Sequence, residues 1–143
     1  MEERKSILII DHEVELYPAL FSLFQRLNYS YSQAETGLSA LAALKGRHYD
    51  LAILELGLQD VDGAGLIAML RRLYPELSVL VLSWDDSAES HRRALQNGAS
   101  GYLLKPLDAR QVLYCAQEIL REAERVRRRA RLLTKKAARK VRV

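Results

Sequence analysis

The chain has 143 residues, of which 49% are hydrophobic and 28% charged, a balance typical of a soluble globular domain large enough to bury a core. No apolar run approaches the roughly 18 residues that a membrane span requires, and the charged start of the chain is unlike a secretory signal. Cys115 is the only cysteine, which excludes an intramolecular disulfide and is typical of proteins of the reducing cytoplasm, where we expect this one.

The net charge of +4 divides unevenly along the chain. Residues 1–120 carry 11 Lys/Arg and 16 Asp/Glu, a net charge of −5. Residues 121–143 carry 11 Lys/Arg and 2 Asp/Glu, a net charge of +9. The sequence therefore predicts two parts: an acidic domain over residues 1–120 and a basic helical extension or linker over residues 121–143.

Short apolar or aromatic runs alternate with amphipathic stretches through the acidic part. The short runs predict strands at residues 7–10, 29–34, 51–54, 79–82 and 102–104. Apolar residues spaced three and four apart predict helices at residues 14–27, 37–45, 64–73 and 87–96, and Asp108 is a good N-cap for a last helix. Because most of the strand runs are apolar without alternation, we expect them to be buried on both faces of a parallel, doubly wound α/β sheet.

In such folds the functional site lies beyond the carboxyl ends of the strands. The residues at those ends are Asp11, His12 and Glu13 after the first strand, Glu55 after the third, Ser83 and Trp84 after the fourth, and Lys105 after the fifth. Acids, a hydroxyl and an ammonium group at one sheet edge indicate a phosphoryl or Mg²⁺ site.

Four segments, at residues 7–13, 49–63, 79–83 and 98–106, resemble the receiver domain of two-component response regulators. The resemblance covers about residues 5–120, with the segments in order and at the expected separations. It implies a flavodoxin-like (CheY-like) fold with five strands in the order 2-1-3-4-5. It also implies a role in bacterial signal transduction by phosphorelay, with a histidine kinase or an output protein as partner.

In that family an acidic pair after the first strand and an aspartate after the third hold Mg²⁺, and the aspartate accepts a phosphoryl group. A Ser or Thr and a Lys then contact the phosphoryl oxygens, and an aromatic residue on the fifth strand reports the change. The resemblance assigns the acidic pocket to Asp11, His12 and Gly57, the phosphoacceptor position to Glu55, the phosphoryl contacts to Ser83 and Lys105, and the switch aromatic to Tyr102.

Three of these positions depart from the family pattern. His12 replaces the second acid, although Mg²⁺ prefers oxygen ligands over imidazole. Glu55 replaces the aspartate, and its extra methylene moves the carboxylate by about 1.5 Å, a misplacement that slows in-line transfer steeply. Trp84 stands beside Ser83, where the family usually has a small residue, and its indole is a candidate for blocking the pocket. We therefore expect no cofactor, with Mg²⁺ binding weakened, and no enzymatic activity.

Glu55 also has a positive interpretation, because a longer carboxylate can reach toward Lys105 and Ser83 and imitate one contact of the phosphorylated state. The resulting hypothesis is an atypical receiver that signals through protein contacts, independently of aspartyl phosphorylation. One alternative is a competent receiver that accepts phosphate from a histidine kinase, including the case in which Glu55 is an isolated Asp→Glu change. His12 and Trp84 argue against that case. A small-molecule substrate is not expected.

The last helix is predicted to continue past residue 120, since no Gly or Pro follows Pro106. Apolar residues three and four apart form a heptad-like series: Val112, Ala116, Ile119, Ala123, Val126, Ala130, Leu133 and Ala137. This series indicates a homodimer seam or a docking helix. Alternatively, the basic residues contact nucleic acid or an anionic membrane surface, or the segment is a solvated linker cut from a longer protein. The basic residues are Arg125, Arg127, Arg128, Arg129, Arg131, Lys135, Lys136, Arg139, Lys140 and Arg142.

Overall fold

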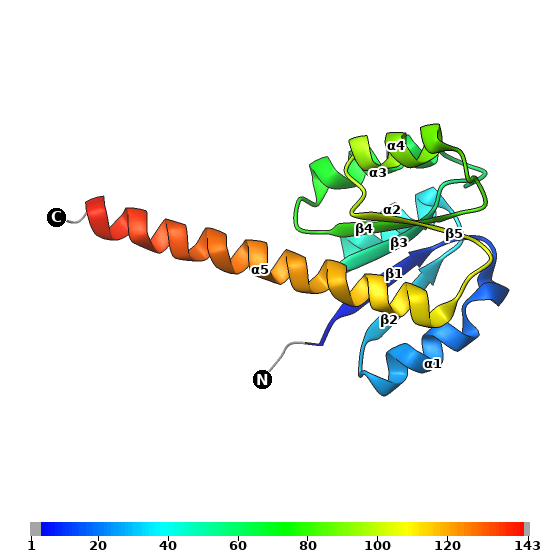
Figure 1. Cartoon of the computed structure of the whole chain (residues 1–143), viewed down its shortest axis with the longest axis horizontal. Coiled ribbons are helices and arrows are strands. Elements are labelled where there is room, and N and C mark those ends of the chain that lie inside the picture. Colours follow the sequence, from blue (N-terminus) through cyan, green and yellow to red (C-terminus); the bar gives the residue numbers. More distant parts are fainter. Residues whose placement is uncertain (1–3, 142–143) are drawn as a thin grey trace.

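The structure is a computed structural model that describes residues 4–141 of the chain. Its strands are β1 (Ser6–Ile10), β2 (Ser30–Ala34), β3 (Leu51–Glu55), β4 (Ser78–Ser83) and β5 (Gly101–Leu104). They form one parallel sheet in the order β2-β1-β3-β4-β5 (Figure 1). The predicted α/β fold class and the strand order 2-1-3-4-5 are confirmed.

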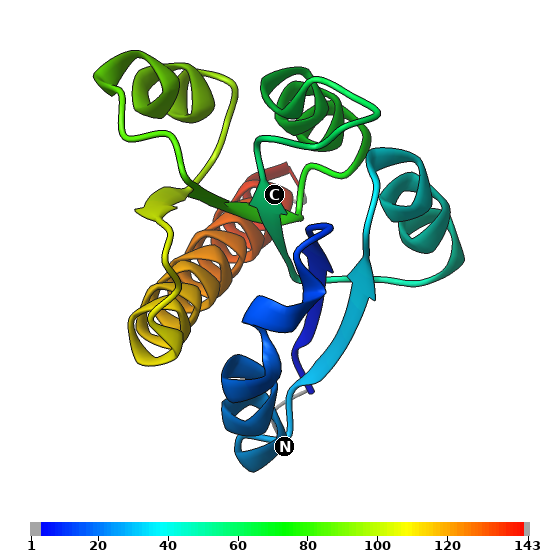
Figure 2. The same cartoon turned by 90° about the vertical axis from the view of Figure 1, so that its right-hand side faces the viewer.

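Helices cover both faces of this sheet. They are α1 (Pro18–Arg26), α2 (Gly37–Gly46), α3 (Gly63–Leu73), α4 (Ala88–Gln96) and α5 (Ala109–Val141), with a short 3-10 turn, η1 (Val14–Leu16), before α1. Helices α1 and α5 lie on one face, and α2, α3 and α4 lie on the other (Figure 2). Each layer packs apolar side chains against the sheet, so the domain has one core on each face.

The interior strand β1 shows why the sheet is buried on both faces. Leu8 and Ile10 belong to the core under α2 and α3, whereas Ile7 and Ile9 belong to the core under α1 and α5. Successive side chains of a strand point to opposite faces, so an unbroken apolar run suits this position. Every residue of β1, β3 and β4 is buried. The polar residues that follow these strands are therefore attached to strands that are buried on both faces of the sheet.

The predicted first helix, residues 14–27, is wrong at its start. The structure has the short turn η1, then Tyr17, and α1 begins only at Pro18. Proline suits the first position of a helix because its ring fixes φ and its missing N–H is not needed there. The apolar spacing from Val14 onward runs across two elements, and the break leaves residues 11–17 as a connection that folds back over the end of β1.

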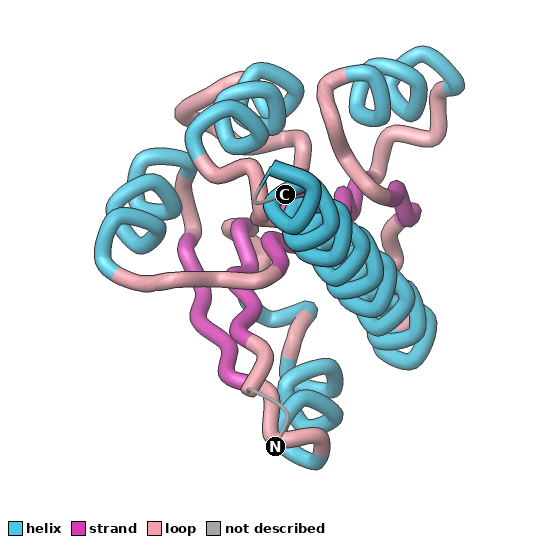
Figure 3. The backbone as a smooth tube through the Cα atoms, turned by 90° about the vertical axis from the view of Figure 1, so that its left-hand side faces the viewer, coloured by secondary structure: helices cyan, strands magenta, loops and turns pink. Residues whose placement is uncertain are grey.

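Helix α5 is the longest element, with 33 residues. The carboxylate of Asp108 accepts hydrogen bonds from the backbone N–H groups of Arg110 (3.0 Å) and Gln111 (3.3 Å), as predicted for an N-cap. The buried residues of α5 end at Leu120, and the rest of the helix projects from the domain, as the predicted extension requires (Figures 1 and 3). Among residues 4–141, no helix combines the length and the apolar character needed to cross a membrane.

Candidate functional site

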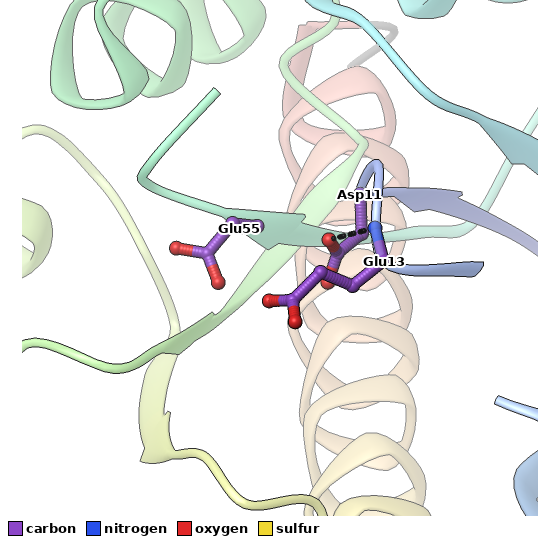
Figure 4. Close-up of side chains that lie close together, drawn as sticks. All are labelled: Asp11, Glu13 and Glu55. Atoms are coloured by element: carbon purple, nitrogen blue, oxygen red, sulfur yellow. Dashed lines mark hydrogen bonds between the residues drawn. The ribbon is translucent and has the colours of Figure 1, made fainter. Parts of the chain in front are cut away.

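Lys105 is the centre of a buried charge cluster at the carboxyl edge of the sheet. Its Nζ atom lies 2.7 Å from Oδ2 of Asp11, 2.8 Å from Oε1 of Glu13 and 2.6 Å from Oε2 of Glu55. The lysine side chain has no exposed surface. Figure 4 shows the three carboxylates, which come from the connection after β1 and from the end of β3. The contact between Glu55 and Lys105 that the sequence predicted is present.

Each carboxylate is also held by a second donor. Oδ2 of Asp11 accepts a hydrogen bond from the hydroxyl of Tyr17 at 2.6 Å, and Oδ1 of Asp11 accepts one from the backbone N–H of Glu13 at 2.9 Å (Figure 4). Oε1 of Glu55 accepts a hydrogen bond from the backbone N–H of Gly57 at 2.8 Å. These donors fix the orientation of the carboxylates, so the cluster is organised before any ligand or partner binds.

The contact between Glu55 and Lys105 is an ion pair rather than a directional hydrogen bond. Oε2 of Glu55 is buried and has no partner with hydrogen-bond geometry, although Nζ of Lys105 is only 2.6 Å away. The short distance establishes the electrostatic contact, and the unfavourable angle leaves one acceptor position of this oxygen unused.

The cluster shifts the pKa values of its members in consistent directions. Burial opposes the charged form of Lys105, but hydrogen bonds from its ammonium group to Asp11 and Glu13, together with the ion pair with Glu55, outweigh burial and hold its pKa above the ordinary value of 10.5. The hydrogen bonds that Lys105 and Trp84 donate to Glu13 keep the pKa of that carboxyl below its ordinary value. Burial, followed by the hydrogen bond to Asp11, raises the pKa of the Tyr17 phenol. At neutral pH, Lys105 and Glu13 are therefore both in their charged forms.

Glu13 was expected at the sheet edge but not in the acidic pocket, and Tyr17 was not expected there; both lie in the site. His12, which was assigned to the acidic pocket, has a side chain that is 44% exposed, with Nδ1 3.8 Å from Oδ1 of Asp11. The three acids whose oxygens lie together are Asp11, Glu13 and Glu55. The carboxylate missing at position 12 is thus supplied one residue later. A run of alternating acids at positions 11, 13 and 15 was the available signal, but which of them turns inward depends on the connection before Pro18.

Trp84 lies over the Lys105 side of the site. Its indole N–H donates a hydrogen bond to Oε1 of Glu13 at 2.8 Å, and Nζ of Lys105 is 5.9 Å from the ring centroid. The side chain is nevertheless 55% exposed. Beside it, a cavity of about 360 Å³ reaches Glu55, Gly57 and Ser83. Trp84 therefore covers part of the entrance and leaves the Glu55 side accessible.

The remaining predicted site residues, Ser83 and Tyr102, lie on β4 and β5. The hydroxyl of Ser83 accepts a hydrogen bond from the backbone N–H of Asp85 at 3.1 Å. No hydrogen bond between Ser83 and Glu55 is present among the residues that the structure describes, so that part of the expectation is not met. The hydroxyl of Tyr102 donates to the carbonyl of Asp85 at 2.6 Å, and its ring stacks on His91 at 4.9 Å between centroids. Tyr102 is thus held against the connection between β4 and α4.

Comparison with known proteins identifies the family. The family model of the response regulator receiver domain matches residues 7–117, which span all five strands. The chain belongs to this family. One relative is BasR, a transcriptional regulatory protein of Escherichia coli K12, which is 34% identical over 100 residues; these are 70% of this chain and 45% of BasR.

A second relative is ZraR, a transcriptional regulatory protein of Escherichia coli O157:H7, which is 30% identical over 102 residues. The match covers 71% of this chain but only 23% of ZraR, so the chain spans less than half of the length of either regulator. Among solved structures, a CheY-like receiver domain from Methanospirillum hungatei JF-1 has a TM-score of 0.80 at 26% identity, covering 86% of this chain and 98% of that one. NtrX from Brucella abortus has a TM-score of 0.83 at 26% identity, and the match covers 91% of this chain and 30% of NtrX.

The acidic pocket of this receiver domain suits Mg²⁺ in its type of donor. One carboxylate oxygen from each of Asp11, Glu13 and Glu55 lies within 4.8 Å of the others, and Mg²⁺ prefers oxygen ligands. The unused acceptor position of Glu55 points to the same kind of ligand. When bound, the ion supplies positive charge against phosphoryl oxygens. Lys105, however, contacts all three carboxylates and therefore competes with a metal ion for them.

Proposed function

We propose that this receiver domain signals through protein contacts without ordinary aspartyl phosphorylation, and that the pair of Glu55 and Lys105 imitates one contact of the phosphorylated state. The observation that supports this proposal is the complete engagement of Lys105 by three carboxylates within a side-chain environment that excludes solvent. The family role of the domain in two-component signal transduction is the starting point, and the mode of signalling is the proposal.

Two physical reasons connect this cluster to loss of phosphoryl transfer. Glu55 is longer than the family aspartate by one methylene, so its carboxylate is displaced by about 1.5 Å from the position that in-line attack requires. Its Oε2 atom already occupies the position 2.6 Å from Nζ of Lys105, where a phosphoryl oxygen would bind. A phosphoryl group on Glu55 would therefore have to displace one carboxylate from Lys105 before it gained that contact.

The same cluster supports the weakened Mg²⁺ binding expected from the sequence. Three carboxylates and one ammonium carry two negative charges in excess, compared with three when the lysine is absent. The imidazole of His12 adds no oxygen ligand. A metal ion entering the pocket must share or replace the ammonium group, which lowers its affinity.

The proposal is tested by incubation with acetyl phosphate and Mg²⁺, followed by intact-mass measurement. We expect no phosphoryl adduct on the natural chain. The control is the triple variant His12→Asp, Glu55→Asp, Trp84→Ala, which restores the family pattern and is expected to gain the adduct. A stable adduct on the natural chain that disappears in the Glu55→Gln variant would contradict the proposal and favour a phosphorylation-competent receiver.

The competent receiver remains the second candidate because two observations favour it. The three acids are close enough to hold a cation, and a cavity of about 360 Å³ gives access to Glu55. Titration with beryllofluoride and Mg²⁺, followed by amide NMR shifts, distinguishes the candidates. Saturable shifts confined to residues around Glu55 and Lys105 indicate competence, whereas the proposed mimic predicts shifts that do not saturate.

Protein partners and a polyanion are the two classes of contact open to the α5 extension, residues 121–141. A helix turns by about 100° per residue, so Arg121, Arg125, Arg128, Lys135 and Arg139 share the side that faces away from the domain. All of these side chains are exposed. We propose nucleic acid as a second, sequence-independent contact through this basic side. Arg142, also counted among the basic residues of the sequence, lies outside the described residues.

A further inference from the structure

The side of α5 opposite to its basic residues carries an apolar strip, which consists of Ala123, Val126, Ala130, Leu133 and Ala137. Val126 is 58% exposed and Leu133 is 60% exposed, although both lie on a helix that otherwise presents charges. The strip continues the series that packs on the sheet further up the same helix, where Val112 and Ala116 are buried. It is therefore the part of one apolar side that the domain does not cover.

The strip faces the same side as the domain. Residues 14 positions apart on a helix, such as Val112 and Val126, differ in direction by only about 40°. A groove of about 650 Å³ lies between the start of the strip and the corner that joins α3 to β4, with Pro75, Glu76 and Ile119 among its lining residues. Figure 1 shows this corner overhanging α5 where the helix leaves the domain. Whatever covers the strip must fit beside this corner.

This placement excludes two occupants. An in-plane membrane helix buries its apolar side in the bilayer, and here the domain stands on that side. A second copy running parallel would bring its own residues 109–120 level with those of the first copy. That level of the apolar side is already filled by the sheet, because Val112, Ala116 and Leu120 are buried there.

We propose that the apolar strip pairs with the strip of a second copy of this chain, running in the opposite direction. In this arrangement the far end of each helix approaches the corner groove of the other copy, and each domain lies beyond the end of the partner helix. No part of either domain then occupies the space of the other. The inference deepens the proposed mode of action through protein contacts, but it depends on the geometry of α5 and not on the state of Glu55.

Charge favours the same orientation. The groove contains Glu76, Glu118 and Glu122, whereas the far end of the strip is flanked by Lys136 and Lys140. An antiparallel pair centred near residue 131 keeps the far end of each helix short of the level of Leu120 and places Glu122 beside Lys140 of the second copy, twice per dimer. It also brings the two Arg129 side chains within about one helical turn of each other near the centre, which is unfavourable. With alanine at three of five strip positions, the dimer is expected to be weak and to depend on protein concentration.

Light scattering of the full chain over a range of concentrations tests the pairing. We expect a monomer–dimer equilibrium that Leu133→Glu abolishes. The matched control is Leu132→Glu, because Leu132 is adjacent and 61% exposed but lies on the opposite side of the helix. Arg129→Gln is expected to tighten the dimer at least several-fold. A chain that stays monomeric at all concentrations, or equal loss of dimer in the two leucine variants, overturns the proposal.

Cross-linking tests the direction. Glu122→Cys and Lys140→Cys are prepared separately in a Cys115→Ala background and treated with a short bismaleimide. Antiparallel pairing predicts cross-linked dimers in the mixture of the two variants and little in either alone. Parallel pairing predicts cross-linking in each variant alone and would overturn the proposed direction. Neither result changes the outcome of the acetyl phosphate experiment, so failure of this inference and failure of the proposed function are distinguishable.

Discussion

Lys105 is the residue on which the site depends, because among residues 4–141 its ammonium group is the only cation in contact with these three acids, two of them fully or almost fully buried. A buried ion pair is a weak contribution to stability compared with apolar packing, but removal of one partner leaves the other charges uncompensated. The cluster thus mainly fixes the relative positions of the carboxyl ends of β1, β3 and β5. It adds little net stability to the fold.

Replacement of the lysine tests this dependence. We expect Lys105→Met to lower the free energy of unfolding by about 3–5 kcal/mol, because three carboxylates lose their shared cation. Urea denaturation at neutral pH measures the change. Lys45→Met is the control, since Lys45 is exposed and its replacement should change the free energy of unfolding by no more than about 0.5 kcal/mol. Equal effects of the two substitutions would show that the cluster is not organised as described.

The single tryptophan reports on the ionisation of Glu13. The pKa of Glu13 lies below its ordinary value of 4.5, because Lys105 and Trp84 donate hydrogen bonds to the ionised carboxylate. The contribution of that carboxylate to stability is therefore present above pH 4.5 and is lost as the pH falls through the lower, folded-state pKa. We expect the fluorescence of Trp84 to change in a step below pH 4.5 while the circular dichroism of the fold persists. The step should be absent in Glu13→Gln, and a step above pH 4.5 contradicts the assignment.

Part of this site was predictable from the sequence, for a specific reason. Asp11, Glu55 and Lys105 directly follow strands of one parallel sheet, and the carboxyl ends of such strands meet at one edge. Glu13 and Tyr17 were not predictable, because they belong to a connection whose path depends on where α1 begins. The spacing of apolar residues suggested a helix from Val14, and the break at Pro18 changes which side chains turn inward.

At the scale of elements, the strands were predicted almost to the residue because their apolar runs are short and end in polar residues. Strands β2 and β5 are less buried than the others, since none of Ser30 to Gln33 and no residue of β5 is fully buried. They lie at the two edges of the sheet, where one side of each strand has no neighbouring strand. The length of α5 was predictable in principle from the absence of Gly and Pro, but its direction relative to the domain required the structure.

Removal of the α5 extension tests the division of the chain. The buried residues of α5 are Val112, Ala116 and Leu120, so truncation after Leu120 should leave both cores intact. We expect thermal unfolding of the truncated chain with a midpoint close to that of the full chain, together with a loss of helical circular dichroism. The surface contact between Lys5 and Glu124 is lost as well, and exposed ion pairs of this kind contribute about 0–1 kcal/mol. An unfolded or molten truncated chain would show that the extension belongs to the domain.

The whole molecule combines an acidic domain with a basic helix, an arrangement that the net charge of +4 conceals. Like charge along the extension resists its collapse onto itself, while the opposite charge of the domain attracts the extension of another molecule. The basic side of α5 remains available in an antiparallel dimer, because it faces away from the apolar strip.

Binding to a double-stranded DNA of arbitrary sequence tests the second contact. Because binding to phosphates releases counterions, we expect the affinity to fall steeply as salt rises, with no preference among sequences. Truncation after Leu120 should abolish binding, whereas Leu133→Glu should reduce it only modestly. Fluorescence polarisation of labelled DNA at several salt concentrations measures both effects. Binding that persists after truncation would place the contact elsewhere.

Helix α5 is continuous from Ala109 to Val141, so the number of residues in the helix determines where its far end lies relative to the domain. At about 1.5 Å per residue the helix measures roughly 50 Å. Each residue also adds a rotation of about 100° about the helix axis. Insertion of one residue between Arg121 and Arg125 would rotate the far segment by about 100° and turn the apolar strip away from its partner. Insertion of seven residues would lengthen the helix and return the apolar strip to within about 20° of its original direction. The number of residues in the extension thus sets both the distance of its far end from the domain and the direction in which the apolar strip faces.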